Sequence, residues 1–306
     1  MATIFVSIAN YKDPEIFNTV NELITKKSNE NEIRICVFSQ IDLEEERWNA
    51  LDDIPEVVHI KVDYKKANGA CWARANAQKQ YNGEDYFMQI DSHIIFVQDW
   101  DKIVIEEHKL ALDYGRKAII SCYPAPYEFN DAGERIVDNP SPTKFDLKGQ
   151  NDQPPYAVPN FMPETDMPQL QYFIAAGFFF TTGDIVENVP YDEEIFFGGE
   201  EITFTIRAYT ANYFSFAPSR YICAHLYGAT KNKGEARPLF WDPKEEEQRK
   251  LTWGYRNKTS MIKVCLICQG NWYGKYGIQN IELYLEYIKR LKIEFPDIDL
   301  TRIKVQ

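Results

Sequence analysis

The chain has 306 residues, of which 44% are hydrophobic and 14% aromatic, so it can bury a sizeable core and is globular rather than disordered. Its 34 Lys and Arg against 46 Asp and Glu give a formal net charge of −12, which argues against a protein that binds chiefly by neutralising a polyphosphate backbone. The opening residues MATIFVSIAN lack a basic segment before an apolar one, and no apolar run reaches the roughly 18 residues of a membrane span, so we expect no membrane association.

The N-terminal part alternates patterns typical of strands and helices. An apolar segment opens it, the chain breaks at residues 10–14, and a helical pattern follows through Ile16, Val20 and Ile24. Further segments of the same two kinds are strands at 32–40, 85–90 and 117–124, and helices at 69–81 and 99–115. This order predicts an α/β fold, with a mixed, mostly parallel central sheet flanked by helices.

The segment 124–168 is rich in proline and has few periodic runs. This composition, with few periodic runs, predicts an elaborated loop region or an edge hairpin, not a separate domain. Regular patterns return at 172–189, continue through a helix-like segment at 199–212, and reach the apolar segment 213–228.

The C-terminal tail holds one strand-like run at 261–269 and one amphipathic helix at 278–295. The helix carries an apolar stripe that core packing or a partner interface would explain: Ile281, Leu285, Ile288 and Leu291. The CxxC spacing at 265–268 lacks a second pair and lies in an apolar run, so a strand is favoured over a zinc site. The six cysteines are scattered among apolar residues as reduced thiols are, which indicates a cytoplasmic protein.

Asp91 and His93 come at the end of the predicted strand 85–90, in the sequence QIDSH. In open α/β sheets ligands bind outside the carboxyl ends of strands, and alternate residues of an extended segment project to the same side. The two side chains can therefore share a divalent ion, such as Mn²⁺ or Mg²⁺, with Ser92 facing away from it. Because the pattern is so short, its spacing alone favours a surface Asp beside a hydrogen-bonded core His.

Two downstream features add chemistry. Gly198 and Gly199 permit close approach of the backbone, and Glu200 and Glu201 follow them at the start of a predicted helix. An ordinary helix start would also favour acidic residues there. His225, one of four histidines, follows a strand-like run and could equally be structural.

Together these stretches resemble a known family of enzymes. The Ala-Arg helix before a strand ending in Asp-Ser-His, the FFGGEE segment and FAPSRYICAH, which ends in His225, resemble the retaining polypeptide N-acetylgalactosaminyltransferases. The resemblance is closer to the cytoplasmic N-acetylglucosaminyltransferases that act on hydroxyproline, which carry the same DxH signature. It covers residues 3–228 in consistent order and implies the glycosyltransferase A fold, which binds nucleotide-diphosphate sugars.

The resemblance implies a role for each matching residue. Asp91, His93 and His225 would hold a divalent metal, Mn²⁺ first and Mg²⁺ second, on the diphosphate of the donor. Arg74 would contact the nucleotide or its phosphates. The nucleotide side of the site would be lined by Ser7, Ile8, Ala9, Asn10, Tyr11 and Ser92.

The donor sugar would lie further along the site. Glu200 and Glu201 would accept hydrogen bonds from its hydroxyls, and Gly177 would leave room for it. Phe197 stands where the first family usually has Trp, so the aromatic wall remains without the indole donor and the identity of the donor sugar stays open. No side chain is identified as a nucleophile, and the phosphate itself can take the proton of the acceptor.

The implied function is transfer of a sugar, N-acetylglucosamine first, from a UDP-sugar to a hydroxyl of a protein, a glycan or a modified nucleobase. The alternatives are a sugar-nucleotide or glycan-binding module without catalysis, and a metal-dependent hydrolase, which usually needs more ligands. Residues 1–245 would form the catalytic domain, with 124–168 as an acceptor-side insertion and 246–306 as an extension packed on it. The segment 228–241 is either a flap that closes on the diphosphate or a solvated loop.

Overall fold

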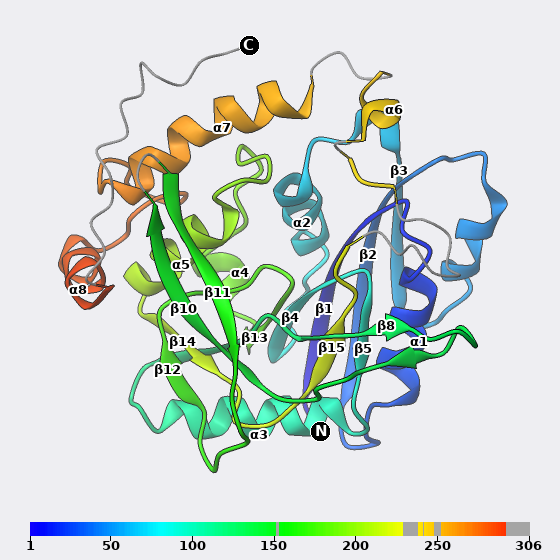
Figure 1. The fold of residues 1–306 in the computed structure, drawn as a ribbon, viewed down its shortest axis with the longest axis horizontal. Coiled ribbons are helices and arrows are strands. Elements are labelled where there is room, and N and C mark those ends of the chain that lie inside the picture. The colour runs from blue at the N-terminus through cyan, green and yellow to red at the C-terminus, as the bar shows by residue number, and fades with distance from the viewer. Residues whose placement is uncertain (151–152, 229–237, 241, 248–251, 292–306) are drawn as a thin grey trace.

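The computed structural model describes residues 1–150, 153–228, 238–240, 242–247 and 252–291 (Figure 1). Its centre is an eight-stranded sheet in the order β12-β14-β6-β13-β4-β1-β2-β3. The parallel half consists of β1 (Thr3–Tyr11), β2 (Glu32–Ile41), β3 (Val57–Asp63) and β4 (Tyr86–Asp91). The mixed, mostly parallel α/β sheet predicted from the sequence is therefore confirmed.

The other half of the sheet contains the reversals of direction. The strand β13 (Phe178–Thr182) runs antiparallel to both of its neighbours, β4 and β6 (Lys117–Ser121). Beyond β6 lie β14 (Tyr213–Ala217), which is parallel to β6, and the edge strand β12 (Gln169–Gln171), which is antiparallel to β14. Most residues of β6, β13 and β14 are buried, because helices or loops cover both faces.

The helices of the predicted pattern flank this sheet (Figure 1). The helix α1 (Ile16–Thr25) buries one apolar stripe that includes Ile16 and Val20, as its spacing predicts. The other long helices of this part are α2 (Ala70–Gln78), α3 (Trp100–Leu112) and α5 (Glu200–Thr210). Short elements complete it: η1 (Glu46–Leu51), η2 (Tyr64–Lys66) and α4 (Ile185–Asn188).

A small three-stranded sheet brings the downstream histidine to the end of β4. The strand β15 (Cys223–His225) lies between β5 (Ile94–Phe96), to which it is antiparallel, and β7 (Ala125–Pro126), to which it is parallel. In this register His225 pairs with Ile94, the residue that follows His93. Residues more than 130 positions apart in sequence thus become neighbours.

The proline-rich segment 124–168 contains the predicted hairpin. Its strands β10 (Thr143–Gln150) and β11 (Gln153–Phe161) pair only with each other, so they form a separate two-stranded sheet and not an edge of the central one. A second, shorter pair joins β8 (Glu128–Phe129) to β9 (Arg135–Ile136).

The prediction of a strand at 261–269 is wrong, because these residues belong to the helix α7 (Trp253–Cys268). Its buried residues recur with helical spacing and include Ser260, Lys263, Val264, Ile267 and Cys268. Lys263 lies among these buried residues, and a lysine in a sequence usually indicates a position that faces solvent. The helical spacing of the apolar residues was therefore not recognised. All six cysteines are buried free thiols, so 265–268 is not paired.

The predicted helix near the end of the chain is α8 (Ile281–Leu291), preceded by the short α6 (Pro243–Glu246) and α7. Its apolar stripe only partly faces the core: Ile288 and Leu291 pack against it, whereas Ile281 and Leu285 are exposed. The buried positions are instead Tyr284 and Tyr287, because a tyrosine packs its ring and satisfies its hydroxyl group at the same time. Core packing therefore does not explain the whole stripe.

None of the helices among the described residues is both long and apolar enough to cross a membrane.

Candidate active site

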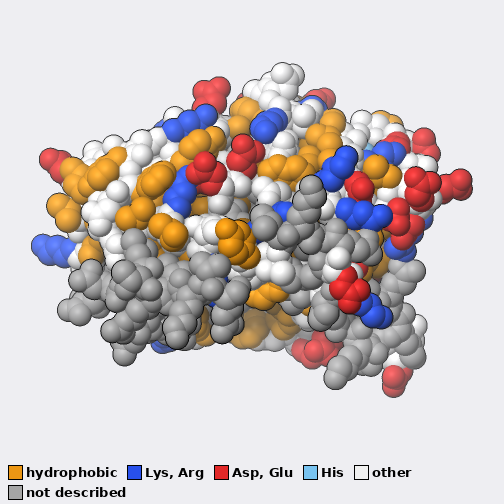
Figure 2. Space-filling view, turned by 90° about the horizontal axis from the view of Figure 1, so that it is seen from above, with side chains coloured by type: hydrophobic (Ala, Val, Ile, Leu, Met, Phe, Trp, Pro, Cys, Tyr) orange, Lys and Arg blue, Asp and Glu red, His pale blue; other side chains and the backbone are white. Residues whose placement is uncertain are grey.

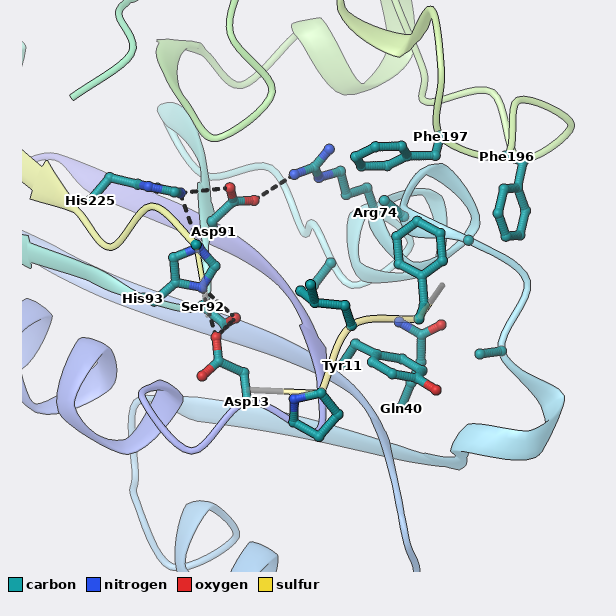
Figure 3. Close-up of a pocket in the computed structure, with 18 of the residues that line it drawn as sticks. Tyr11, Asp13, Gln40, Arg74, Asp91, Ser92, His93, Phe196, Phe197 and His225 are labelled. Carbon is teal, nitrogen blue, oxygen red and sulfur yellow. Dashed lines mark hydrogen bonds and ion pairs between the residues drawn. The ribbon is translucent and has the colours of Figure 1, made fainter. Parts of the chain in front are cut away.

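The end of β4 gathers three metal-capable side chains (Figure 3). The Nε2 atoms of His93 and His225 lie 3.0 Å apart, and His225 Nε2 lies 3.2 Å from Asp91 Oδ2. One ligand atom from each of the three residues lies within 4.8 Å of the others, and both histidines are buried. A carboxylate oxygen and two imidazole nitrogens that converge in this way form a donor set suited to a divalent cation such as Mn²⁺.

The backbone explains why these three meet. The strand β4 ends at Asp91, and the chain enters β5 three residues later, so His93 is held between two strands. The hydroxyl group of Thr19, on α1, accepts a hydrogen bond from the backbone N–H of Ile94 and donates to the carbonyl of Ser92. The turn at the site is thereby attached to the core.

Asp13 orients His93 from the side opposite to His225. Its Oδ2 lies 2.7 Å from His93 Nδ1 and accepts a hydrogen bond from the Ser92 hydroxyl group at 2.8 Å. Because a carboxylate can only accept, the proton of the imidazole resides on Nδ1, and Nε2 keeps its lone pair. A metal-ligating histidine usually has such a partner.

Arg74 joins the metal-capable group to the start of α5. The guanidinium group lies on α2, and its side chain is 6% exposed. Its Nη2 donates to Asp91 Oδ1 at 2.6 Å, and its Nη1 donates to Glu200 Oε1. Burial opposes ionisation of Asp91, but the hydrogen bond from His225 and the positive charge of Arg74 outweigh it and hold the pKa of Asp91 well below its usual range.

A pocket of about 410 Å³, which we call the β1 pocket, opens on one side of this group. Its walls come from the carboxyl ends of β1 and β2, from the residues before α2, and from three phenylalanines: Ala9, Tyr11, Gln40, Ala67, Gly69, Phe196, Phe197 and Phe240. Figure 3 shows Tyr11 and Gln40 at one end of it and Asp91 and His93 at the other. A flat aromatic or heterocyclic group fits such walls, and an anionic group would lie beside Arg74.

A second pocket, of about 420 Å³, opens on the other side of the group, and we call it the α5 pocket. It is lined by the start of α5, by the segment before β13, by the β10–β11 hairpin, by Tyr123 after β6 and by Met261 on α7. Its other residues include Pro154, Pro155, Tyr156, Gly177, Gly198, Gly199, Glu200 and Glu201. Arg74, Asp91, Phe197, His225 and Tyr227 line both pockets. The two pockets therefore form one site with a charged wall between them.

Glu201 lines the α5 pocket and is half-buried. Its Oε1 accepts a hydrogen bond from the backbone N–H of Ala176 at 2.9 Å, and its Oε2 accepts one from the Tyr123 hydroxyl group. Burial raises the pKa of Glu201 to about 7, although these hydrogen bonds oppose the rise. A carboxyl group with this pKa changes its charge near neutral pH.

The family model described as Glycosyltransferase (GlcNAc) matches residues 3–54 and 46–271, which is most of the chain. The chain belongs to the Glycosyltransferase (GlcNAc) family. A search of curated protein sequences found no match.

Solved structures place this family member in the glycosyltransferase A fold. It superposes on the structure of GalNAc-T7 with UDP, GalNAc and Mn²⁺ with a TM-score of 0.62, at 13% identity, over 95% of this chain and 57% of that one. It superposes on Staphylococcus aureus TarS 1–349 in complex with UDP-GlcNAc with a TM-score of 0.51, at 13% identity, over 100% of this chain and 76% of that one. At such identities the likeness shows the fold, as predicted from the sequence.

The structure brings most of the predicted site residues of this glycosyltransferase-family chain to one place. Asp91, His93 and His225 meet as predicted, and Arg74, Gly177, Phe197, Glu200 and Glu201 surround them. A Cβ at Gly177 would lie 2.9 Å from Asp91 Oδ2, so glycine is needed beside the metal-capable group itself. The sequence prediction gave Gly177 the role of making room for a sugar.

The prediction for 7–11 needs correction. Ala9 and Tyr11 line the β1 pocket, whereas Ser7, Ile8 and Asn10 are completely buried and do not line it. The Asn10 amide instead donates to Ser39 and accepts from the backbone N–H of Asp13. Side chains alternate between the two faces of a strand, so Ala9 and Tyr11 share the face of the pocket near the end of β1, whereas Ile8 and Asn10 lie on the other face.

Ser92 lines the β1 pocket, and its hydroxyl group binds the Asp13 carboxylate, which agrees with a side chain that faces away from the metal-capable atoms. Asp13 itself was missed by sequence reasoning. The available signal was its position in the break just after β1, where polar side chains face the same edge of the sheet as the end of β4.

The segment 228–241, interpreted as either a flap or a solvated loop, lies mostly outside the described residues, namely at 229–237 and 241. Its described part lines the β1 pocket with Pro238, Leu239 and Phe240. The ring of Phe240 packs edge-on against Tyr11, Phe196 and Phe197.

Proposed function

We propose that this protein is a metal-dependent retaining glycosyltransferase that moves N-acetylglucosamine from a UDP-sugar to a hydroxyl group of an acceptor. The observation that carries the proposal is the group formed by Asp91, His93 and His225 in the wall between two pockets. A donor that bridges the pockets would have its diphosphate beside this group and beside Arg74. Membership of the Glycosyltransferase (GlcNAc) family supports the reaction and the sugar.

Each pocket has a share in this proposal. The β1 pocket would take the uridine between Tyr11, Gln40 and the phenylalanines, and the α5 pocket would take the sugar beside Glu200 and Glu201. The two superposed structures support such a donor, since one holds UDP, GalNAc and Mn²⁺ and the other holds UDP-GlcNAc. The hydroxyl-bearing acceptor would approach from the side of the β10–β11 hairpin.

The chemistry follows from where negative charge develops. As the bond between the anomeric carbon and the phosphate oxygen breaks, a divalent cation, Mn²⁺ first and Mg²⁺ second, would stabilise the charge on the departing diphosphate. Arg74 contributes a second positive charge, already oriented by Asp91 and Glu200. The acceptor oxygen forms the new bond on the face that the diphosphate leaves, and its proton passes to the diphosphate.

The side chains present leave no need for a nucleophilic residue. Glu200 is engaged by Arg74, and Glu201 is engaged by Tyr123 and Ala176, so both suit hydrogen bonding to sugar hydroxyls better than attack. The acceptor would be a protein, a glycan or a modified nucleobase. We keep the prediction of a cytoplasmic location, which the six free thiols support.

The test is isothermal titration of UDP, with and without Mn²⁺, into the wild type and His93→Ala. We expect Mn²⁺ to strengthen binding to the wild type at least tenfold and to have little effect on the variant, because a metal ligand is lost. Equal affinity in all four titrations would contradict the metal-bridged donor.

Release of UDP from a panel of UDP-sugars, with and without acceptors, then separates an enzyme from a binding module. Turnover with UDP-GlcNAc supports transfer. Tight, metal-dependent binding without turnover of any UDP-sugar would instead favour the non-catalytic alternative.

A further inference from the structure

Two turns of the active site begin the helices that carry its buried ion pair. The turn 67–69 precedes α2 and Arg74, and it lines the β1 pocket. The turn 197–199 precedes α5 and Glu200, and it lines the α5 pocket. The position of each turn therefore sets the position of one partner of the Arg74–Glu200 pair.

The first turn and its following residue touch Phe196, the residue just before the second turn. The backbone N–H of Ala70 donates to the carbonyl of Phe196 at 3.1 Å. Gly69 has a φ of +94°, and a Cβ there would lie 2.3 Å from the same carbonyl. The contact requires glycine for both its backbone conformation and its lack of a side chain.

Helix α7 lies over both turns. Figure 1 shows it crossing the top of the molecule, and Figure 2 shows the same face from above, with hydrophobic side chains spread over its left and centre. Arg256 Nη1 donates to the Ala67 carbonyl at 2.8 Å and to Asn68 Oδ1 at 2.7 Å. The next residue, Asn257, accepts a hydrogen bond from the backbone N–H of Gly198 at 2.7 Å.

Further contacts keep α7 in this position. Val264 packs so closely on the second turn that a Cβ at Gly199 would lie 2.4 Å from it. The Lys263 ammonium group, 9% exposed, lies 2.7 Å from Asp192 and 2.6 Å from Glu194, in the segment that leads to that turn. The helix is thus attached to the same part of the chain that it orders.

We propose that Arg256 and Asn257 are positioning residues of the active site, each for a different pocket. Arg256 fixes the turn 67–69 and so the shape of the β1 pocket, whereas Asn257 fixes the turn 197–199 and so the shape of the α5 pocket. This assignment rests on the proposed function, in which the first pocket takes UDP and the second takes the sugar. It gives the C-terminal region a part in donor recognition.

The experiment compares the affinities for UDP and for UDP-GlcNAc, both with Mn²⁺, by isothermal titration. Arg256→Ala is expected to lower the affinity for UDP by about three- to tenfold, because the hydrogen bonds to a pocket wall are lost. Asn257→Ala is expected to keep the affinity for UDP within about twofold of the wild-type value. It should nevertheless lower the ratio of UDP-GlcNAc affinity to UDP affinity by about three- to tenfold. Asn257→Asp keeps the acceptor for Gly198 and is expected to restore that ratio.

Controls separate positioning from general damage. Ile262→Ala changes an exposed position of the same helix, 43% accessible, and should leave both affinities unchanged. Thermal unfolding of every variant shows which are folded, and Arg256→Lys and Asn257→Asp serve as milder changes.

The outcomes distinguish a failure of this assignment from a failure of the proposed function. If the wild type binds both ligands and the two alanine variants do so within twofold, or if Asn257→Ala loses both affinities by one common factor, the assignment is overturned while the proposed function stands. If the wild type binds neither ligand, the proposed function is itself overturned, and the assignment with it.

Discussion

The β1 pocket and the α5 pocket share a wall but are built in different ways. The β1 pocket lies at the carboxyl ends of neighbouring parallel strands, and backbone and aromatic rings form most of it. The α5 pocket depends on carboxylates whose partners come from distant segments, as Glu200 does with Arg74 and Glu201 with Tyr123. The first is a product of sheet geometry, whereas the second depends on long-range pairing of charges.

The largest effect is expected from Arg74→Ala, which removes the link between the pockets. It leaves Asp91 and Glu200 without their cation, which should lower the free energy of unfolding by about 3–5 kcal/mol and UDP-sugar turnover about a thousandfold. Arg290→Ala is the matched control, because Arg290 pairs with Glu286 at 2.8 Å on the surface and is worth about 0.5 kcal/mol. Denaturant unfolding and UDP release measure both, and equal losses in the two variants would contradict the role of Arg74.

A smaller effect, confined to the metal-capable group, is expected from Asp13→Asn. Loss of the carboxylate removes the preference for a proton on His93 Nδ1, so the affinity for Mn²⁺ should fall by about 10- to 100-fold. Asp52→Asn is the control, because Asp52 Oδ1 lies 2.7 Å from Nδ1 of His59, away from both pockets. The measurement is the Mn²⁺ concentration that half-saturates UDP binding, and an unchanged value in Asp13→Asn would refute the orienting role.

The charge of the α5 pocket should appear in the pH dependence of stability. Glu201 has a pKa of about 7 when folded and 4.5 when unfolded, so between these values the folded protein binds a proton that the unfolded chain does not. Its contribution to stability is therefore full below pH 4.5 and is lost as the pH rises to 7, by about 1.4 kcal/mol per pH unit. In Glu201→Gln this loss is absent. The unfolding temperature of the variant relative to the wild type should therefore rise by a few degrees between pH 5 and pH 7. If the unfolding temperatures of the two proteins change with pH in the same way, the ionisation belongs to another group.

The smallest effect is expected from Phe197→Trp, at a residue that is 42% exposed and lines both pockets. Stability should change by less than about 0.5 kcal/mol, and the affinity for UDP by less than about twofold. The added indole N–H should show only in the preference for one donor sugar, as a change of about three- to tenfold in the ratio of kcat/KM for UDP-GlcNAc and UDP-GalNAc. A tenfold change in UDP affinity would show that this ring serves mainly the nucleotide.

Sequence patterns predicted the part of the site that local spacing determines. The strand β4 and the DxH pair at its end were evident from a short apolar run, and the resemblance added His225 and Arg74. Asp13 could not be found in this way, because its contact with His93 exists only once β1 and β4 are paired. The same limit applies to every contact that joins two unrelated segments.

The helix α7 was mispredicted for a different reason. Its apolar run is short and contains β-branched residues, which favours a strand locally. Packing of Val264 against Gly199 and pairing of Lys263 with Asp192 favour the helix, and neither contact can be read from a single segment. The contribution of this region to the pockets was consequently invisible in the sequence.

The hairpin of β10 and β11 has a consequence for how such proteins diverge. Its strands pair with each other, and it meets the α5 pocket through Pro154, Pro155 and Tyr156. The base of the hairpin is part of the core, because Phe145 is buried against Tyr123 and Phe173, so only changes confined to 154–156 should alter the α5 pocket without disturbing its surroundings. In an evolving family, substitutions at this tip can therefore reshape the α5 pocket while the buried base of the hairpin is kept.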